Sequence, residues 1–231
     1  MKLSEKSHEF YLRIVPGGMI RNGTLASLLL LNLTGLLSLI YSPSAFYFYL
    51  SIIPMILGDL FGLLFIIAPY KYELLFVLYT GLFGVFSSLT CFSCSQVLMI
   101  HDLKLRDQWI PIINLLLLII SGVLMYIFHF RALYNDYYAN TSSVVSFPLI
   151  SIVTGIGYLS TQVFTVLFHN VNVEDISLII ALEAWSVGGL LISTCIHKYF
   201  YMLQHKKELI EKEPDLGMTK KERFRKFGSK M

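Results

Sequence analysis

The sequence predicts an all-α protein, a polytopic membrane helix bundle of about six transmembrane helices. Of its 231 residues 55% are hydrophobic and only 14% are charged, whereas soluble proteins carry about 25% charged residues. Charges are nearly absent from several runs of 18 or more residues, and a helix of that length can cross roughly 30 Å of hydrocarbon. Helices are expected because lipid offers no hydrogen-bond partner to an open strand.

Six hydrophobic runs follow one another, separated by short polar segments, and each predicts one membrane span. We therefore divide the chain into an N-terminal segment (1–23), a bundle (24–197) and a basic tail (198–231). His197 to Glu213 can continue the last helix until Pro214, whose ring removes a backbone donor. The predicted spans are Thr24–Tyr41, Ala45–Ala68, Leu74–Ile100, Trp109–Phe128, Val144–Phe168 and Ile176–Ile196.

The basic residues predict the orientation of the chain. With six spans both termini lie on the same side, and that side receives 16 of the 18 Lys and Arg residues. Because Lys and Arg are retained on the cytoplasmic side of membranes, we expect both termini in the cytosol. We expect an integral membrane protein, located in an endomembrane compartment.

Small and hydroxyl side chains recur at intervals of three and four residues, so they share one face of each predicted helix. Such faces let helices approach closely in lipid and bond to one another. We therefore expect tightly packed helix contacts along these faces. They comprise Glu183, Ser186, Ser193 and His197 in the last span, Gly84, Ser87, Cys91 and Cys94 in the third, and Gly58 and Gly62 around Asp59 in the second.

Two carboxylates, Asp59 and Glu183, lie within predicted spans that contain no Lys or Arg. A charged side chain at the centre of a bilayer costs on the order of 2.5–3.5 kcal/mol on insertion scales, so it usually faces the bundle or a cavity. Both are candidates for proton or cation coupling, and buried structural acids are the alternative. Their depths predict no direct pair; Gln162 and Cys91 lie nearer the level of Glu183 and are candidate cavity residues.

Polar groups at the opposite surface allow another interpretation. His101 and His169 fall there with several carboxylates, a combination that can support acid–base chemistry on lipid. Their spacing matches no zinc motif such as HExxH, so no metal or cofactor is expected. Cys91 and Cys94 match CxxC, yet they lie inside an apolar span where a thiolate is disfavoured; packing is the expected role.

The tail carries ten basic and five acidic residues between Lys198 and Met231. Cations mixed with aromatic side chains suit contact with anionic lipid headgroups, and a solvated topology anchor is the alternative. Nothing in the pattern indicates nucleic acid as a partner. The candidate headgroup contacts are Lys220, Lys221, Arg223, Arg225 and Lys226.

Together these features predict a non-enzymatic scaffold that packs against lipids, other membrane proteins or copies of itself. A proton- or cation-coupled transporter or channel centred on Glu183 is the first alternative, and a membrane-embedded lipid-modifying enzyme with His101 and His169 is the second. No motif for binding nucleotides or for hydrolysis is found in the sequence.

Overall fold

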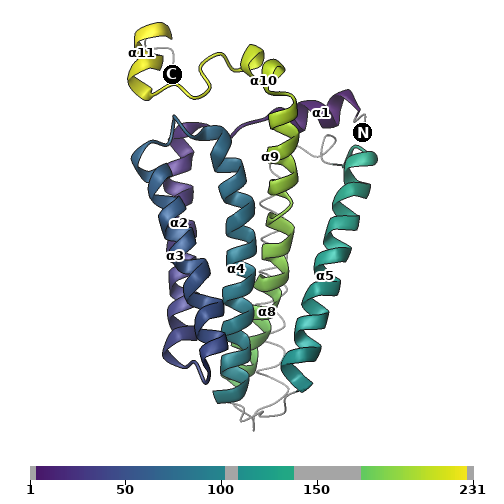
Figure 1. Ribbon diagram of the computed structural model, residues 1–231. Coiled ribbons are helices and arrows are strands. Elements are labelled where there is room, and N and C mark those ends of the chain that lie inside the picture. The colour runs from purple at the N-terminus through teal and green to yellow at the C-terminus, as the bar shows by residue number, and fades with distance from the viewer. Residues whose placement is uncertain (1–3, 102–108, 138–172, 228–231) are drawn as a thin grey trace.

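The computed structural model describes residues 4–101, 109–137 and 173–227, and every regular element in these ranges is a helix. Five long helices lie side by side, and short helices lie at one end of them (Figure 1). In chain order the helices are α1 (Glu5–Leu12), α2 (Gly17–Ile40), α3 (Ala45–Ile67), α4 (Glu73–His101), α5 (Trp109–Tyr134), α8 (Val173–Ile192), α9 (Cys195–Gln204), α10 (Lys206–Lys212) and α11 (Lys220–Phe227).

Among the described residues, five helical stretches are long and apolar enough to cross a membrane: α2, α3, α4, α5 and the stretch Ile176–Gln204. The predicted all-α bundle is therefore confirmed. The predicted span Val144–Phe168 lies outside the described residues. Helix α2 begins at Gly17 rather than Thr24: Pro16 occupies the N-cap, where its fixed φ suits a helix start, and Glu73 accepts the Gly17 N–H.

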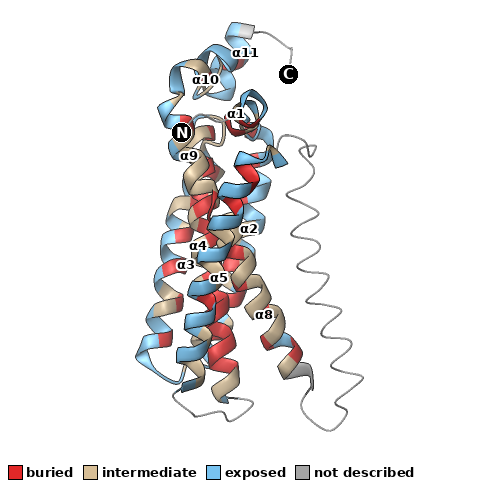
Figure 2. Ribbon diagram, turned by 90° about the vertical axis from the view of Figure 1, so that its right-hand side faces the viewer, coloured by how far each residue is buried: buried red, intermediate tan, exposed pale blue. Residues whose placement is uncertain are grey.

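Helix α4 is the centre of the bundle. It lies between the α2–α3 pair and α8 (Figure 1), and its most extensive packing is against α8. Of its apolar window 56% is buried, against 6% for α5. Red buried positions accordingly run along α4 while α5 is mostly pale blue (Figure 2). The side chains of α4 therefore pack mainly against other helices, and those of α5 are mainly exposed on the outside of the bundle.

Three serines join α2, α3 and α4. The Oγ atoms of Ser38, Ser51 and Ser93 lie 2.7–2.9 Å from one another, and all three side chains are fully buried. Ser93 also donates to the carbonyl of Tyr47 at 3.2 Å. Since hydroxyl pairs across helices satisfy polar groups that lipid cannot, this cluster fixes the three helices at one level.

Backbone atoms meet where α4 crosses α8. A Cβ added at Gly84 would lie 2.5 Å from the Gly189 carbonyl oxygen and 2.6 Å from the Ser193 nitrogen. One turn away, Ser186 donates to the Ser88 carbonyl at 2.8 Å. The close contact predicted from small residues at helical spacing is confirmed for this pair.

The last predicted helix is not continuous. α8 ends at Ile192 and α9 begins at Cys195, because Ser193 and Thr194 bond their hydroxyls to the carbonyls of Leu190 and Leu191, a pattern that bends helices. A second break follows at His205, and α10 ends at Lys212, before Pro214. The prediction of one unbroken helix to Glu213 is therefore wrong.

Both ends of the chain lie at the same end of the bundle, together with α1, α10 and α11 (Figure 1); we call it the terminal end. Gly217 has a φ of +76° in the turn between α10 and α11, a conformation that favours glycine. Thr219 and Glu222 then form a reciprocal capping box, each accepting the other's backbone N–H at 3.3 and 2.7 Å. The box starts α11 and holds the pKa of Glu222 below its usual value.

Candidate functional site

Glu183 lies on α8 and meets two neutral donors on α4. Its Oε1 accepts hydrogen bonds from the Ser95 hydroxyl and from the Gln96 amide at 2.9 Å. Ser95 and Gln96 are both buried, whereas Glu183 is half-buried. The close packing of α4 and α8 brings Ser95 and Gln96 to Glu183. Both donors are neutral, and no Lys or Arg among the described residues pairs with the acid.

A third helix extends this group. The Asn114 amide of α5 donates to Gln96 Oε1 at 3.4 Å and lies 3.5 Å from the Met99 sulfur. Gln96 therefore links α5 to Glu183, donating to the acid and accepting from Asn114. We call Ser95, Gln96, Asn114 and Glu183 the Glu183 group. It joins α4, α5 and α8 at one level.

Asp59 belongs to a different group. Its Oδ1 accepts from the Asn32 amide of α2 at 2.8 Å, so it sits on the α2–α3 contact and is not bonded to Glu183. Gly58 and Gly62 beside it face Leu31 and Leu28, which a Cβ would approach within 2.4 and 2.8 Å. The acid thus borders a packed helix contact, and the prediction that it forms no pair with Glu183 is confirmed.

Cys91, another predicted cavity residue, is not among the described residues that bond Glu183. Cys91 and Cys94 are free, fully buried thiols in an apolar cluster with Leu98 and Leu182, which confirms the packing role predicted for the CxxC pair. Gln162 lies outside the described residues. The sequence therefore predicted approximately which part of α4 lies beside Glu183. The residues that bond the acid, Ser95 and Gln96, lie one turn beyond Cys91.

Of the two histidines predicted at the surface opposite the terminal end, His101 lies within the described residues. His101 is exposed at the last residue of α4, where its ring contacts Tyr41 with centroids 4.9 Å apart. His169 lies outside the described residues. Among residues 4–101, 109–137 and 173–227, no three His, Cys, Asp or Glu side chains converge to hold a metal ion.

Arg223 does not lie with the other tail cations. Its guanidinium is 8% exposed and bonds Glu73 at the start of α4 as well as Asp215, at 2.8 Å. It also covers the Tyr70 ring at 5.3 Å. Glu73 in turn accepts the backbone N–H of Gly17 at 2.9 Å. The arginine therefore fastens α11 to the bundle.

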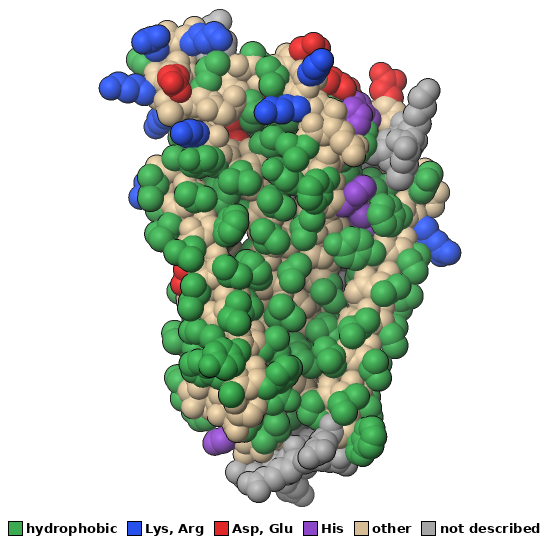
Figure 3. All heavy atoms as spheres, in the orientation of Figure 1, with side chains coloured by type: hydrophobic (Ala, Val, Ile, Leu, Met, Phe, Trp, Pro, Cys, Tyr) green, Lys and Arg blue, Asp and Glu red, His purple; other side chains and the backbone are tan. Residues whose placement is uncertain are grey.

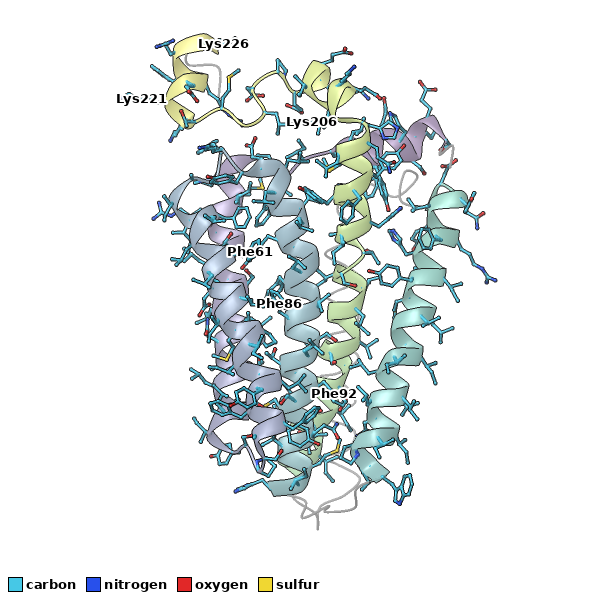
Figure 4. The ribbon with its side chains drawn as sticks, in the orientation of Figure 1. Phe61, Phe86, Phe92, Lys206, Lys221 and Lys226 are labelled. Carbon is cyan, nitrogen blue, oxygen red and sulfur yellow. The ribbon has the colours of Figure 1, made fainter. Side chains whose placement is uncertain are left out.

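The other candidate cations of the tail face outward. Lys220, Lys221, Arg225 and Lys226 are exposed, and Phe224 between them is 63% exposed. Figure 4 shows Lys221 and Lys226 on α11 and Lys206 on α10, all at the terminal end. Basic side chains gather at this end in Figure 3, above a shaft that is almost wholly hydrophobic.

A cluster of rings at the terminal end was not predicted from sequence. His8 of α1 bonds the Tyr201 hydroxyl at 2.6 Å and Glu208 of α10 at 2.8 Å, and these contacts hold the pKa of Glu208 low. Beside them Tyr11, His129 and His197 meet from three helices. Ser7, the residue before His8, donates to Asp136 at 2.7 Å and adds a further contact of α1.

Comparison of the chain with models of known protein families, with curated proteins and with solved structures finds no match in any of the three.

Proposed function

We propose that the protein is a non-enzymatic membrane scaffold that holds a folded, basic helix against the membrane surface to bind anionic lipid headgroups. One observation carries the proposal: Arg223 fixes α11 to the bundle through Glu73 and Asp215, while its other cations stay exposed. If the cations of the tail served only to set the orientation of the chain in the membrane, α11 would not need to be fixed to the bundle by an ion pair.

The geometry of α11 supports this role. On a helix, Lys221 and Arg225 are four residues apart and share the side opposite Arg223. Phe224 projects beside them and is exposed, so cations and an aromatic ring are presented together. Helices of this composition lie at the boundary between headgroups and acyl chains. α11 rests on the turn before α4, next to Tyr70, where apolar helices give way to polar residues.

Orientation and compartment belong to the same proposal. Sixteen of 18 Lys and Arg residues would face the cytosol in a six-span chain, and the cytoplasmic leaflet carries the anionic lipids. We therefore propose that both termini are cytosolic and that the protein resides in an endomembrane. Fluorescent tags at the two ends, read by protease protection and by microscopy, test both points.

Neutralising the exposed face of α11 is expected to abolish lipid selectivity. Each Lys or Arg near an anionic surface contributes about 1 kcal/mol. In the K220Q/K221Q/R225Q variant, the preference for phosphatidylserine over phosphatidylcholine should therefore fall by up to about a hundredfold. The protein is reconstituted with phosphatidylcholine and phosphatidylserine, recaptured, and its bound lipids are quantified by mass spectrometry. Wild type should enrich phosphatidylserine and the variant should not.

The matched control removes the same number of charges elsewhere. Lys6, Arg21 and Arg131 are exposed residues outside α11, and the K6Q/R21Q/R131Q variant should keep the enrichment. Equal losses in the two variants would mean that general basicity, not α11, attracts the lipid. No enrichment by wild type would remove the proposal.

A second candidate function rests on the Glu183 group. A carboxyl in the membrane interior whose partners are a hydroxyl and an amide can take up and release a proton, and intramembrane acids of this kind mark ion or proton pathways. We propose proton or cation coupling at Glu183 as the alternative. Gln96 would position the acid by bonding it directly, and Asn114 would hold Gln96 by donating to its amide oxygen.

Glu183→Gln is expected to abolish pH-driven flux in proteoliposomes because glutamine keeps the size and hydrogen bonds of the side chain but cannot exchange a proton. Asp59→Asn, in the separate group with Asn32, should retain flux. Circular dichroism and elution volume verify folding of both. Wild-type transport by the Glu183 variant, or no transport by the wild type, would eliminate this candidate.

A further inference from the structure

Three side chains from three helices converge at the terminal end. Tyr11 of α1 places its hydroxyl oxygen 2.7 Å from Nε2 of His129 on α5. The same oxygen is 3.2 Å from Nδ1 of His197 on α9, and the two nitrogens are 3.4 Å apart. Tyr11 is 1% exposed and His129 4% exposed. Two imidazoles and a phenol therefore direct one oxygen and two nitrogens at a common point.

The distances between these three atoms are close to those between three ligand atoms bound to one metal ion. Ligands bound tetrahedrally at about 2.0–2.1 Å lie roughly 3.3 Å from one another, and two of the three edges are 3.2 and 3.4 Å. The circle through the three atoms has a radius of only about 1.8 Å, so one position lies about 2 Å from all of them. The shorter edge, 2.7 Å between the Tyr11 oxygen and His129 Nε2, needs to open by about 0.6 Å to reach the tetrahedral separation.

We propose that Tyr11, His129 and His197 bind one divalent first-row transition metal ion, for which Zn²⁺ is the reference. Imidazole nitrogen suits Zn²⁺ and Cu²⁺, and the phenol oxygen becomes a ligand by losing its proton. Three protein ligands leave a fourth position for water. The site is independent of the lipid contact at α11 and of the Glu183 group.

The metal-free state is the hydrogen-bonded triad described above. With both rings neutral, separations of 2.7 and 3.2 Å admit an arrangement in which Tyr11 donates its hydroxyl proton to His129 and the Nδ1–H of His197 donates to the Tyr11 oxygen. Zn²⁺ would replace both hydrogens: the His197 proton moves to its other ring nitrogen, and the Tyr11 proton leaves to solvent. Binding should therefore release about one proton per metal ion, since ligands bind in their deprotonated forms.

A direct titration tests the site. The full chain, purified in detergent with an affinity tag that lacks histidine and stripped with a chelator, is titrated with Zn²⁺ by calorimetry in buffers of different ionisation enthalpy. We expect one Zn²⁺ per chain with a Kd below about 10 µM and about one proton released. Co²⁺ in the same site should give the visible absorption of a tetrahedral ion.

Variants assign the ligands. His197→Gln should weaken Zn²⁺ binding at least a hundredfold and Tyr11→Phe at least tenfold, with proton release lost in Tyr11→Phe. His101→Gln at the opposite end and His205→Gln nearby should bind as wild type does. Wild-type protein that takes up neither Zn²⁺ nor Co²⁺ would overturn the proposal, and so would unchanged binding in both ligand variants. The wild-type titration and the Co²⁺ spectrum decide the matter even where a variant misfolds.

Discussion

Replacing Gly84 by alanine is expected to destabilise the bundle by about 3 kcal/mol, the upper part of the range for overpacked cores. The new methyl group would lie 2.5 Å from the Gly189 carbonyl oxygen and 2.6 Å from the Ser193 nitrogen. Both are backbone atoms of α8 and its bend, so no side chain can rotate away. α4 and α8 must separate, which weakens the bond from Ser186 to Ser88 as well.

Unfolding in mixed micelles, followed by circular dichroism, measures this loss. Gly23→Ala is the matched control, because its methyl group would meet only the Phe76 ring edge at 3.7 Å, an ordinary contact. Alanine is also the better helix former by about 1 kcal/mol in water, so the control should be neutral or slightly more stable. Equal unfolding midpoints for the two variants would refute the close contact of α4 and α8.

Arg223→Ala is expected to detach α11 from the bundle. Breaking a buried ion pair by removing one partner costs about 3–5 kcal/mol, because the other charge stays buried without compensation. Glu73, which is 4% exposed, would regain water only if the tail moved away. The loss should therefore appear in the docking of the tail and much less in the unfolding of the long helices.

Hydrogen exchange of α11 and tryptic cleavage at Lys220 and Lys221 report the detachment. Cleavage should accelerate at least tenfold in Arg223→Ala and stay unchanged in Arg225→Ala, whose side chain is exposed. Removing both charges in Glu73→Leu/Arg223→Leu should restore protection in part, since apolar replacements of a buried pair are often neutral. Slow cleavage in Arg223→Ala would mean that other contacts dock the tail.

The helices and their contact faces follow from local pattern. Ser186 and Ser193 are seven residues apart, about two helical turns, and Gly84 and Ser88 are four apart on α4; this spacing brings them to the α4–α8 contact. The partners of Glu183 could not be predicted in this way. Ser95 and Gln96 bond it because of how α4 is rotated about its axis, which depends on the packing of several helices at once.

The role of Arg223 could not be predicted from the sequence either, because it depends on a contact between distant parts of the chain. In sequence it is one of five cations in α11, and its ion pair with Glu73, 150 residues earlier, cannot be read from the local pattern. The ring cluster has a partial signal in the sequence. His129 and His197 directly follow predicted spans, and His8 lies in the N-terminal segment on the same predicted side of the membrane, but the predicted topology gives no distances between them.

The contacts of α1 bear on the order in which the chain assembles. His8 bonds Tyr201 and Glu208, residues 193 and 200 positions later, and Ser7 bonds Asp136 from 129 positions away. A ribosome adds about 5–20 residues per second, so α1 is made well before these partners and cannot bond them until they follow. In that interval it is accessible to chaperones and modifying enzymes, and it docks only after α9 and α10 have been made.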